Sequence, residues 1–371
     1  MPVEPLRIVT VAPLRFPIRL PHAGGLESAL WNETRRLRAR GHSVTMIAVE
    51  GSDFLAGGPR EFVLPAVAWA EGEIAADDTY PAGYLDRALP ALERALDRVA
   101  DRADELDVVV NHCLHGVPLR RAGRLGVPMV STLHTPVVPE LVEADVACDG
   151  PRSEFLSVSR HTRAEWARVG IESTVLANGV DGDTWVEGPG GAGLVWFGRL
   201  VPEKGAHLAI EVARSLGLPL ILVGRIGDRD YFDTEIAPRL GRGVEYAGVL
   251  APTELAALVG RSACALATPV WEEPFGLVVP EALLCGTPVA AFGVGGILEM
   301  AVGTVGLETA PMGDVAALAD VVAGLLRQTV VEPSFRSRLR ASAAAAFSLD
   351  TRIDRLEQVL RRVSAARELA A

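Results

Sequence analysis

The sequence predicts an α/β protein made of two doubly wound domains, each built on a parallel sheet. Its 371 residues are enough for two domains at roughly 150 residues each. Short apolar runs alternate with longer amphipathic segments, which is typical of strands and crossover helices in parallel sheets. A glycine-rich stretch near the middle interrupts this alternation, which then starts again.

The first domain is predicted over residues 1–184, with six strands. The first strand leads into an amphipathic helix at about residues 25–40, for which Gly41 is a suitable left-handed C-terminal cap. An acidic, turn-rich segment at residues 72–84 is expected to be a loop. The predicted strands are Arg7–Val11, Ser43–Ala48, Val108–Asn111, Pro128–Leu133, Phe155–Val158 and Ser173–Leu176.

The glycine-rich stretch NGVDGDTWVEGPGGAGLVWFG, residues 178–198, predicts a hinge between the domains. The second domain, residues 190–349, is expected to contain helices such as Ala206–Leu216. Its predicted strands are Gly193–Phe197, Leu218–Val223, Val244–Ala247, Cys264–Ala267 and Val289–Ala291. Residues 350–371 carry apolar side chains spaced for one helix face, at Ile353, Leu356, Val359 and Leu360. We expect this last helix to cross back to the first domain.

Charge and cysteine usage restrict the classes of partner and compartment. A formal net charge of −11 argues against a broad surface for nucleic acid or anionic membrane. Cys113, Cys148, Cys264 and Cys285 are scattered, which indicates neither a zinc site nor a disulfide framework. There is no secretory signal pattern and no apolar run near the ~18 residues of a membrane span. These features favour a soluble, cytoplasmic protein.

The only lysine among the 36 basic side chains is Lys204, in the stretch WFGRLVPEKG. An ammonium is a compact point charge suited to a phosphate oxygen, whereas guanidinium is a planar fork. Arg199 lies five positions earlier, and Gly198 and Gly205 allow close approach of the backbone. The segment therefore predicts a diphosphate site after the first strand of the second domain. A solvated surface lysine is the competing interpretation.

Two further segments are suited to bind an anion or a sugar. Gly24 and Gly25 follow the first strand and begin the first helix, where bare N–H groups attract an anion, although a plain turn is an equally good explanation. The segment WEEPFGLVVPEAL places Glu273 before a helix and Glu281 on it. Carboxylates accept hydrogen bonds from vicinal hydroxyls, and the N–H groups of residues 276–278 add donors. Because parallel sheets bind ligands at the carboxyl ends of their strands, we expect these groups around one cleft.

Together, these motifs resemble the retaining glycosyltransferases of family four, which have the GT-B fold of two Rossmann-like domains facing a central cleft. The resemblance rests on Gly24-Gly25, ANGVD, FGRLVPEKG, EEPFGLVVPEALLCGTPV and GVGGILE, and spans nearly the whole chain. The Arg-rich, Ala-rich composition is typical of a high-GC actinobacterial source, where such nucleotide-sugar-dependent enzymes are found. The resemblance implies a UDP- or GDP-linked sugar donor and neither a metal nor a cofactor.

The resemblance also implies roles for individual residues. Arg199 and Lys204 would hold the donor diphosphate together with the helix end at Gly24 and Gly25. Glu281 would bind the ribose hydroxyls. The transferred sugar would be held by Glu273, by the backbone of Phe275, Gly276, Leu277 and Val278, and by His134, which follows a first-domain strand. Arg225, Val249 and Leu250 would flank the base. His134 as a buried structural residue is the alternative, and His112 and His115 are less specific candidates.

Retention of configuration usually indicates double displacement through a carboxylate nucleophile. The resemblance implies instead a front-face attack in which the leaving diphosphate accepts the proton of the acceptor hydroxyl. The protein then acts by positioning and by stabilising phosphate charge.

The acceptor is expected to be a small molecule bound by loops of the first domain, such as a natural product, a cyclitol or an aminocyclitol. Asp77 and Asp78, near Tyr80, would suit a cationic acceptor, whereas a metal-binding pair there is less favoured than a solvated turn. Four arginines, Arg35, Arg36, Arg38 and Arg40, would instead suit an anionic lipid such as a phosphoinositide.

Other classes of protein remain as alternatives. A sugar-nucleotide 2-epimerase shares the architecture. An NAD-dependent enzyme is disfavoured because the sequence has no G-x-G-x-x-G fingerprint after the first strand. A sugar-binding protein without catalytic activity offers no reason for a diphosphate site.

Overall fold

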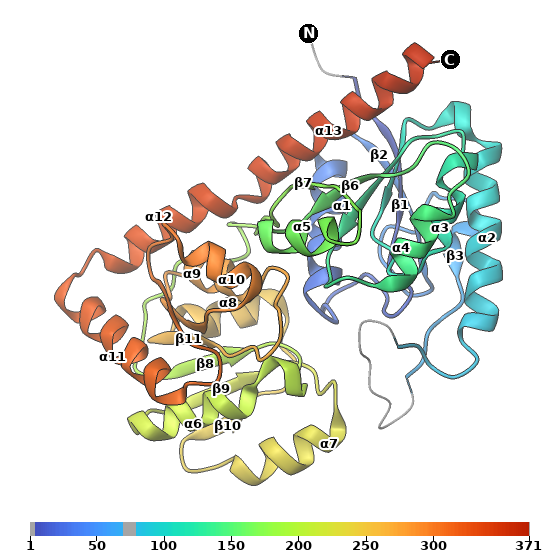
Figure 1. The fold of residues 1–371 in the computed structure, drawn as a ribbon. Coiled ribbons are helices and arrows are strands. Elements are labelled where there is room, and N and C mark those ends of the chain that lie inside the picture. The colour runs from blue at the N-terminus through green and yellow to red at the C-terminus, as the bar shows by residue number, and fades with distance from the viewer. Residues whose placement is uncertain (1–3, 70–78, 371) are drawn as a thin grey trace. The chain divides into compact units, whose positions relative to one another are not determined.

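The computed structural model describes residues 4–69 and 79–370, which form two compact units (Figure 1). Unit 1 contains residues 4–69, 79–177 and 350–370, and unit 2 contains residues 178–349. In the part of the chain that the structure describes, the chain passes from unit 1 to unit 2 at residues 177–178 and returns at residues 349–350. Each unit is a parallel-sheet α/β structure, which confirms the predicted fold class.

Within the described residues, unit 1 has a seven-stranded sheet in the order β3-β2-β1-β4-β5-β6-β7, paired in parallel throughout. The strands are β1 (Arg7–Val11), β2 (Ser43–Val49), β3 (Val63–Leu64), β4 (Val108–Asn111), β5 (Met129–Leu133), β6 (Glu154–Ser157) and β7 (Thr174–Val175). The helices are α1 (Gly25–Ala39), α2 (Leu85–Asp101), α3 (Val117–Arg121), α4 (Pro139–Val146), α5 (Arg160–Ala167) and α13 (Leu349–Ala370). The strand order reverses between β1 and β4, where such sheets bind ligands.

Unit 2 repeats this plan in the part of the chain that the structure describes, with six parallel strands in the order β10-β9-β8-β11-β12-β13. They are β8 (Leu194–Phe197), β9 (Leu220–Val223), β10 (Val244–Tyr246), β11 (Cys264–Ala267), β12 (Val289–Phe292) and β13 (Leu307–Ala310). The helices are α6 (Ala206–Leu216), α7 (Arg229–Tyr231), α8 (Pro252–Gly260), α9 (Val278–Leu284), α10 (Gly295–Ala301), α11 (Val315–Val331) and α12 (Phe335–Phe347). Its strand order reverses between β8 and β11.

Helix α2 shows how the sequence pattern builds the core of unit 1. Leu92, Leu96 and Val99 recur at helical spacing and are fully buried. They pack in one cluster with strand residues such as Val109 and Leu133. Burial of this apolar face stabilises the helix against the sheet.

Helix α13 packs against unit 1 after the chain has left unit 2. Ile353, Leu356 and Leu360 are fully buried, whereas Val359, on the same predicted face, is only partly buried. Polar contacts hold its other side, with Arg40 Nη1 paired to Asp354 Oδ1 at 2.5 Å and His42 Nε2 lying 2.9 Å from Glu357 Oε1.

The structure differs from the sequence-based prediction in three places. Strands β3 and β13 were not predicted. Strand β3 has only two residues, and β13 carries Glu308 and Thr309 between its apolar ends, so neither gives a clear apolar run. Residues 178–184, predicted in the first domain, belong to unit 2 because Val180 N donates to Phe347 O at 2.8 Å.

Replacing Leu356 by Ala tests the docking of α13. We expect a loss of about 2–5 kcal/mol in the free energy of unfolding, because the substitution leaves a cavity in a fully buried position. Urea unfolding followed by circular dichroism measures the change. Leu298→Ala, at a position 54% exposed on α10, is the control and should change stability little. An L356A protein as stable as the wild type would contradict the docking.

Candidate functional site

The predicted donor-binding residues of unit 2 all follow the carboxyl ends of four neighbouring strands. Arg199 and Lys204 follow β8, Arg225 follows β9, Val249 and Leu250 follow β10, and Glu273, Phe275, Gly276, Leu277, Val278 and Glu281 follow β11. These strands are adjacent in the order β10-β9-β8-β11. Because the strands are parallel, the structure brings residues from four separate stretches to one edge of the sheet.

The backbone around Lys204 is held by the end of β11. Gly205 has φ 65°, and a side-chain carbon there would lie 2.1 Å from Thr268 O, so only glycine fits. Thr268 Oγ1 donates to Gly205 O at 2.8 Å and accepts from Trp196 Nε1 at 3.0 Å. These contacts fix where the side chain of Lys204 begins.

Lys204 and Glu273 form an ion pair, with Lys204 Nζ 2.5 Å from Glu273 Oε2. Trp271 Nε1 donates to the same oxygen at 2.9 Å, and Nζ lies 4.7 Å from the centre of the indole ring. Ammonium, carboxylate and aromatic face thus form one cluster. Lys204 and Glu273 were predicted from the sequence, whereas Trp271 was not, although it lies only two residues before Glu273.

The loop that carries Glu273 is supported by the segment GVGGILE. Gly296 N donates to Glu273 O at 2.8 Å. Gly295 has φ 51°, and a side-chain carbon there would lie 2.2 Å from Glu273 O. The two motifs therefore form one packed unit, and the glycine permits their close approach.

Glu281 lies in the first turn of α9, which begins at Val278. Burial raises the pKa of its carboxyl group to about 8. The group is therefore mainly protonated at neutral pH and can both donate and accept hydrogen bonds. Leu277 precedes the helix, so its N–H lies outside the intrahelical hydrogen bonds.

Arg199 and Arg225 are carried by neighbouring segments. Leu200 N donates to Arg225 O at 2.8 Å, and Leu200 pairs with Ile226 in a parallel bridge. Arg199 Nη2 lies 3.8 Å from Glu203 Oε1. This places a second basic residue in the same loop as Lys204.

The predicted anion site of unit 1 has an unforeseen acidic neighbour. Gly24 is the N-cap of α1, and Glu27, 3% exposed, lies in the first turn. A carboxylate already complements the positive end of the helix dipole at this position.

His134 follows β5 and is partly exposed. Its Nε2 lies 2.8 Å from His112 Nδ1, so the structure brings two of the three candidate histidines together. His115 instead faces Glu140, with 3.3 Å between His115 Nδ1 and Glu140 Oε1. Burial lowers the pKa of both His134 and His115, and that of His134 falls well below its ordinary value.

Two buried charged residues of this region, Glu33 and Arg352, were missed by the sequence analysis. Glu33 Oε1 lies 3.1 Å from His112 Nε2, and Arg352 Nη2 donates to Glu33 Oε2 at 2.9 Å. The sequence contained an indication of these buried charges, because both residues interrupt an apolar helix face. Glu33 lies between Leu30 and Leu37 on α1, and Arg352 precedes Leu356 by one turn of α13.

The arginines considered for lipid binding are engaged within unit 1. Arg38 donates to the carbonyl oxygens of Val44 and Phe54, each at 3.0 Å. Arg36 and Arg40 pair with acidic residues of α13, among them Asp350. Their charges therefore already have partners in the fold.

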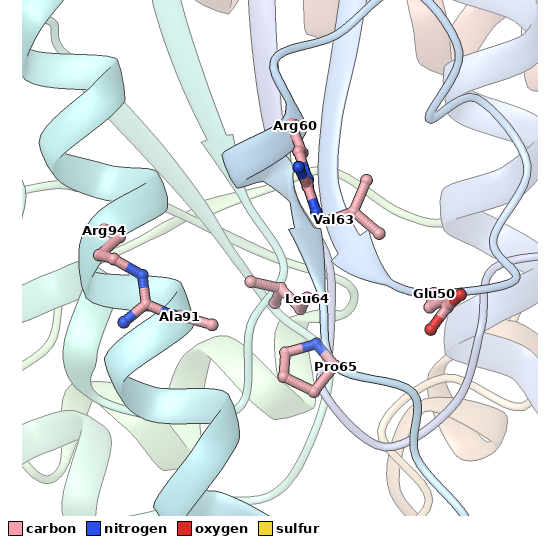
Figure 2. A pocket seen from close by; sticks show the side chains of 7 residues that line it. All are labelled: Glu50, Arg60, Val63, Leu64, Pro65, Ala91 and Arg94. Atoms are coloured by element: carbon pink, nitrogen blue, oxygen red, sulfur yellow. The ribbon is translucent and has the colours of Figure 1, made fainter.

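A cavity of about 480 Å³ lies at the β3 edge of unit 1 (Figure 2). Figure 2 shows Ala91 and Arg94 reaching it from α2. Its lining is Glu50, Arg60, Val63, Leu64, Pro65, Ala91 and Arg94. None of the predicted site residues lines it. Asp77 and Asp78, considered for the acceptor, lie outside the described residues.

The four cysteines are free thiols. Among the helices of the described residues, none combines the length and the apolarity needed to cross a bilayer.

Two family models match the chain. The model described as Glycosyltransferase Family 4 matches residues 23–184. The model described as Glycosyl transferases group 1 matches residues 190–345.

Individual proteins of known sequence or structure are also similar. A glycogen synthase of Mycobacterium tuberculosis is 38% identical over 47% of this chain, and the match covers 43% of that enzyme, less than half its length. A phosphatidyl-myo-inositol mannosyltransferase of Mycobacterium leprae is 26% identical over 92% of each chain. The crystal structure of Anabaena Alr3699/HepE with UDP and glucose has a TM-score of 0.72 at 20% identity, covering 96% of this chain and 99% of that one. This structural likeness shows the GT-B fold.

The raised pKa of Glu281 predicts how Glu281→Gln changes stability with pH. Between the ordinary value of 4.5 and about 8, the folded protein keeps a proton that the unfolded chain has lost. The wild type therefore loses up to ~1.4 kcal/mol of stability per pH unit as the pH rises through this range, and E281Q lacks this loss. Thermal unfolding of both proteins at pH 5 to about 8 measures the difference. Glu308→Gln, at an exposed position of β13, keeps Glu281 and should therefore show the same pH dependence as the wild type.

Proposed function

We propose that the chain, whose first half matches the model of Glycosyltransferase Family 4 and whose second half matches that of Glycosyl transferases group 1, is a family-four glycosyltransferase that transfers a hexosyl sugar from a nucleoside diphosphate sugar to a hydroxyl group. The observation that carries the proposal is the cluster of Lys204, Glu273 and Trp271. A cation for phosphate and an acid for sugar hydroxyls lie side by side there, at the strand ends that also carry Arg199 and Glu281.

The ion pair of Lys204 and Glu273 suggests how the donor binds. A diphosphate carries more negative charge than one carboxylate and would attract the ammonium away from Glu273. Glu273 then accepts hydrogen bonds from hydroxyls of the transferred sugar, while Trp271 keeps the carboxylate oriented. Glu281 binds the ribose hydroxyls, and Arg225, Val249 and Leu250 flank a uracil or guanine base.

The proposed reaction retains the configuration of the anomeric carbon. The bond from this carbon to the diphosphate breaks on the same face on which the bond to the acceptor oxygen forms. A diphosphate oxygen takes the proton of the acceptor hydroxyl. Arg199 and Lys204 stabilise the negative charge on the leaving diphosphate, and His134 contacts the transferred sugar. The proposal assigns no step to a metal or a cofactor.

For the acceptor we propose a small cyclitol or aminocyclitol of natural-product metabolism in the cytoplasm. The similarity to a mannosyltransferase whose name specifies phosphatidyl-myo-inositol supports a cyclitol ring. The same similarity keeps a phosphoinositide lipid as the second candidate acceptor. The internal ion pairs of Arg36 and Arg40 favour the free cyclitol, because they leave those arginines less available for a lipid phosphate.

A thermal-shift panel of UDP-, GDP-, ADP- and dTDP-sugars, followed by product analysis with cyclitol acceptors, tests this function. We expect one nucleotide series to raise the melting temperature. We also expect a glycosylated product with the anomeric configuration of the donor. Release of a free epimer without any acceptor would favour the 2-epimerase, and stabilisation by NAD alone would contradict the proposal.

Lys204→Ala and Glu273→Ala should each lower turnover by at least ~100-fold while the protein stays folded, as for loss of one contact that stabilises the transition state. Initial rates of nucleoside diphosphate release measure the effect. Lys204→Arg should also be impaired, because a planar guanidinium does not reproduce the ammonium between Glu273 and the Trp271 ring. Glu272→Ala, the exposed neighbour of Glu273, is the control. Turnover near that of the wild type in K204A and E273A would contradict the roles proposed for Lys204 and Glu273.

A further inference from the structure

Four side chains of unit 1 form a continuous buried chain of contacts that ends at His134. Arg352 Nη2 donates to Glu33 Oε2 at 2.9 Å, and Glu33 Oε1 lies 3.1 Å from His112 Nε2. His112 Nδ1 then lies 2.8 Å from His134 Nε2. Arg352, Glu33 and His112 are at most 5% exposed, and His134, the last member, is partly exposed.

The positions of the protons on the two histidine rings can be assigned by starting from Glu33. Burial alone would raise the pKa of Glu33, but the positive guanidinium of Arg352, whose Nη2 donates to Glu33 Oε2 at 2.9 Å, lowers it, so Glu33 is ionised. An ionised carboxylate only accepts hydrogen bonds, so His112 Nε2 carries a proton. Between His112 Nδ1 and His134 Nε2, one nitrogen must donate and the other accept.

The buried charges decide which nitrogen donates. Arg352 and Glu33 neutralise each other, so a proton added to His112 would leave one uncompensated positive charge in the interior. A neutral His112 keeps the charges of this buried cluster balanced, and in that form its Nδ1 holds a lone pair. His134 Nε2 must then donate. Because burial lowers the pKa of His134, its ring is also neutral and Nδ1 keeps a lone pair. Within the described residues, this Nδ1 makes no hydrogen bond.

We propose that Glu33 and His112 are positioning residues for His134, which they hold with Nε2–H toward His112 and with the Nδ1 lone pair presented to a substrate hydroxyl. The assignment of that hydroxyl to the transferred sugar rests on the proposed function. The proton placement itself does not. His134 thus accepts a hydrogen bond and fixes the orientation of the hydroxyl that donates it.

Arg352 sets the orientation of Glu33 and connects the chain of contacts to the boundary of the unit. Its Nη1 donates to Leu176 O at 2.8 Å and to Ala177 O at 3.0 Å, just before the chain enters unit 2. Arg352 also follows directly after the point where the chain returns to unit 1. The guanidinium therefore fixes one carboxylate oxygen and leaves the other for His112.

Nitrogen-15 NMR of the histidine rings in the full-length wild type tests the proposal without any substrate. We expect neutral His112 and His134 rings, both protonated at Nε2 and bare at Nδ1. His42 provides an internal reference, because its Nδ1 accepts from Leu6 N at 2.9 Å while its Nε2 faces Glu357. A doubly protonated His112, or a proton on His134 Nδ1, would overturn the inference.

Glu33→Gln should reverse the chain of hydrogen bonds. Arg352 requires the amide oxygen, so the NH₂ group faces His112 Nε2, which must now accept. Protons then lie on Nδ1 of both rings, and His134 presents a donor in place of an acceptor. We expect kcat to fall roughly tenfold or more, the effect of one mispaired polar contact. Glu357→Gln is the matched control, since the backbone N–H fixes His42, and it should preserve both tautomers and kcat.

E33Q leaves the Arg352 charge without a partner, and this change can unfold the protein. In that case Glu33→Asp, which keeps the ion pair, should retain the wild-type tautomers, and the wild-type spectrum still tests the proton placement. Reversed tautomers with unchanged kcat would overturn the positioning role. Wild-type tautomers as expected, in a chain that transfers no sugar from any nucleotide donor, would support the proton placement and reject only the proposed function.

Discussion

Parallel pairing of β10, β9, β8 and β11 is the constraint on which the candidate site depends. Each strand delivers the residues that follow it to the same edge of the sheet, so loops that are far apart in sequence become neighbours. The basic loop after β8 and the acidic loop after β11 meet for this reason, at 2.5 Å between Lys204 and Glu273. Reversal of any one of these strands would move its loop to the opposite edge.

Close approach of backbones makes this meeting possible. Gly205 lies against Thr268 O, and Gly295 lies against Glu273 O, each at a distance that excludes a side-chain carbon. Both glycines also have positive φ, so two separate demands select the same residue. The functional side chains therefore project from loops whose backbones are held by these contacts.

The two units handle buried charge in different ways. In unit 1, Glu33 is ionised and paired with both Arg352 and His112. Through His112 it determines which ring nitrogen of His134 donates a hydrogen bond and which accepts one. In unit 2, burial keeps Glu281 largely protonated at neutral pH. A paired carboxylate can orient a neighbouring ring, whereas a protonated one offers both a donor and an acceptor. The same residue type thus serves two chemistries because its surroundings differ.

The amino-acid sequence determined the fold class, the strand-forming runs in both units and the position of the donor-binding motifs. These features depend on local periodicity and on short spacings, which one stretch of chain carries by itself. The edge strands β3 and β13 were not predicted from the sequence because they lack an apolar run. Only the tertiary structure decided that Trp271 shares Glu273 with Lys204, and that Glu33 and Arg352 support the histidine pair. Residues 33 and 352 meet because the chain returns to unit 1 at its end. Contacts over such sequence separations are set by packing of the whole unit, and no local pattern specifies the partner of a buried charge.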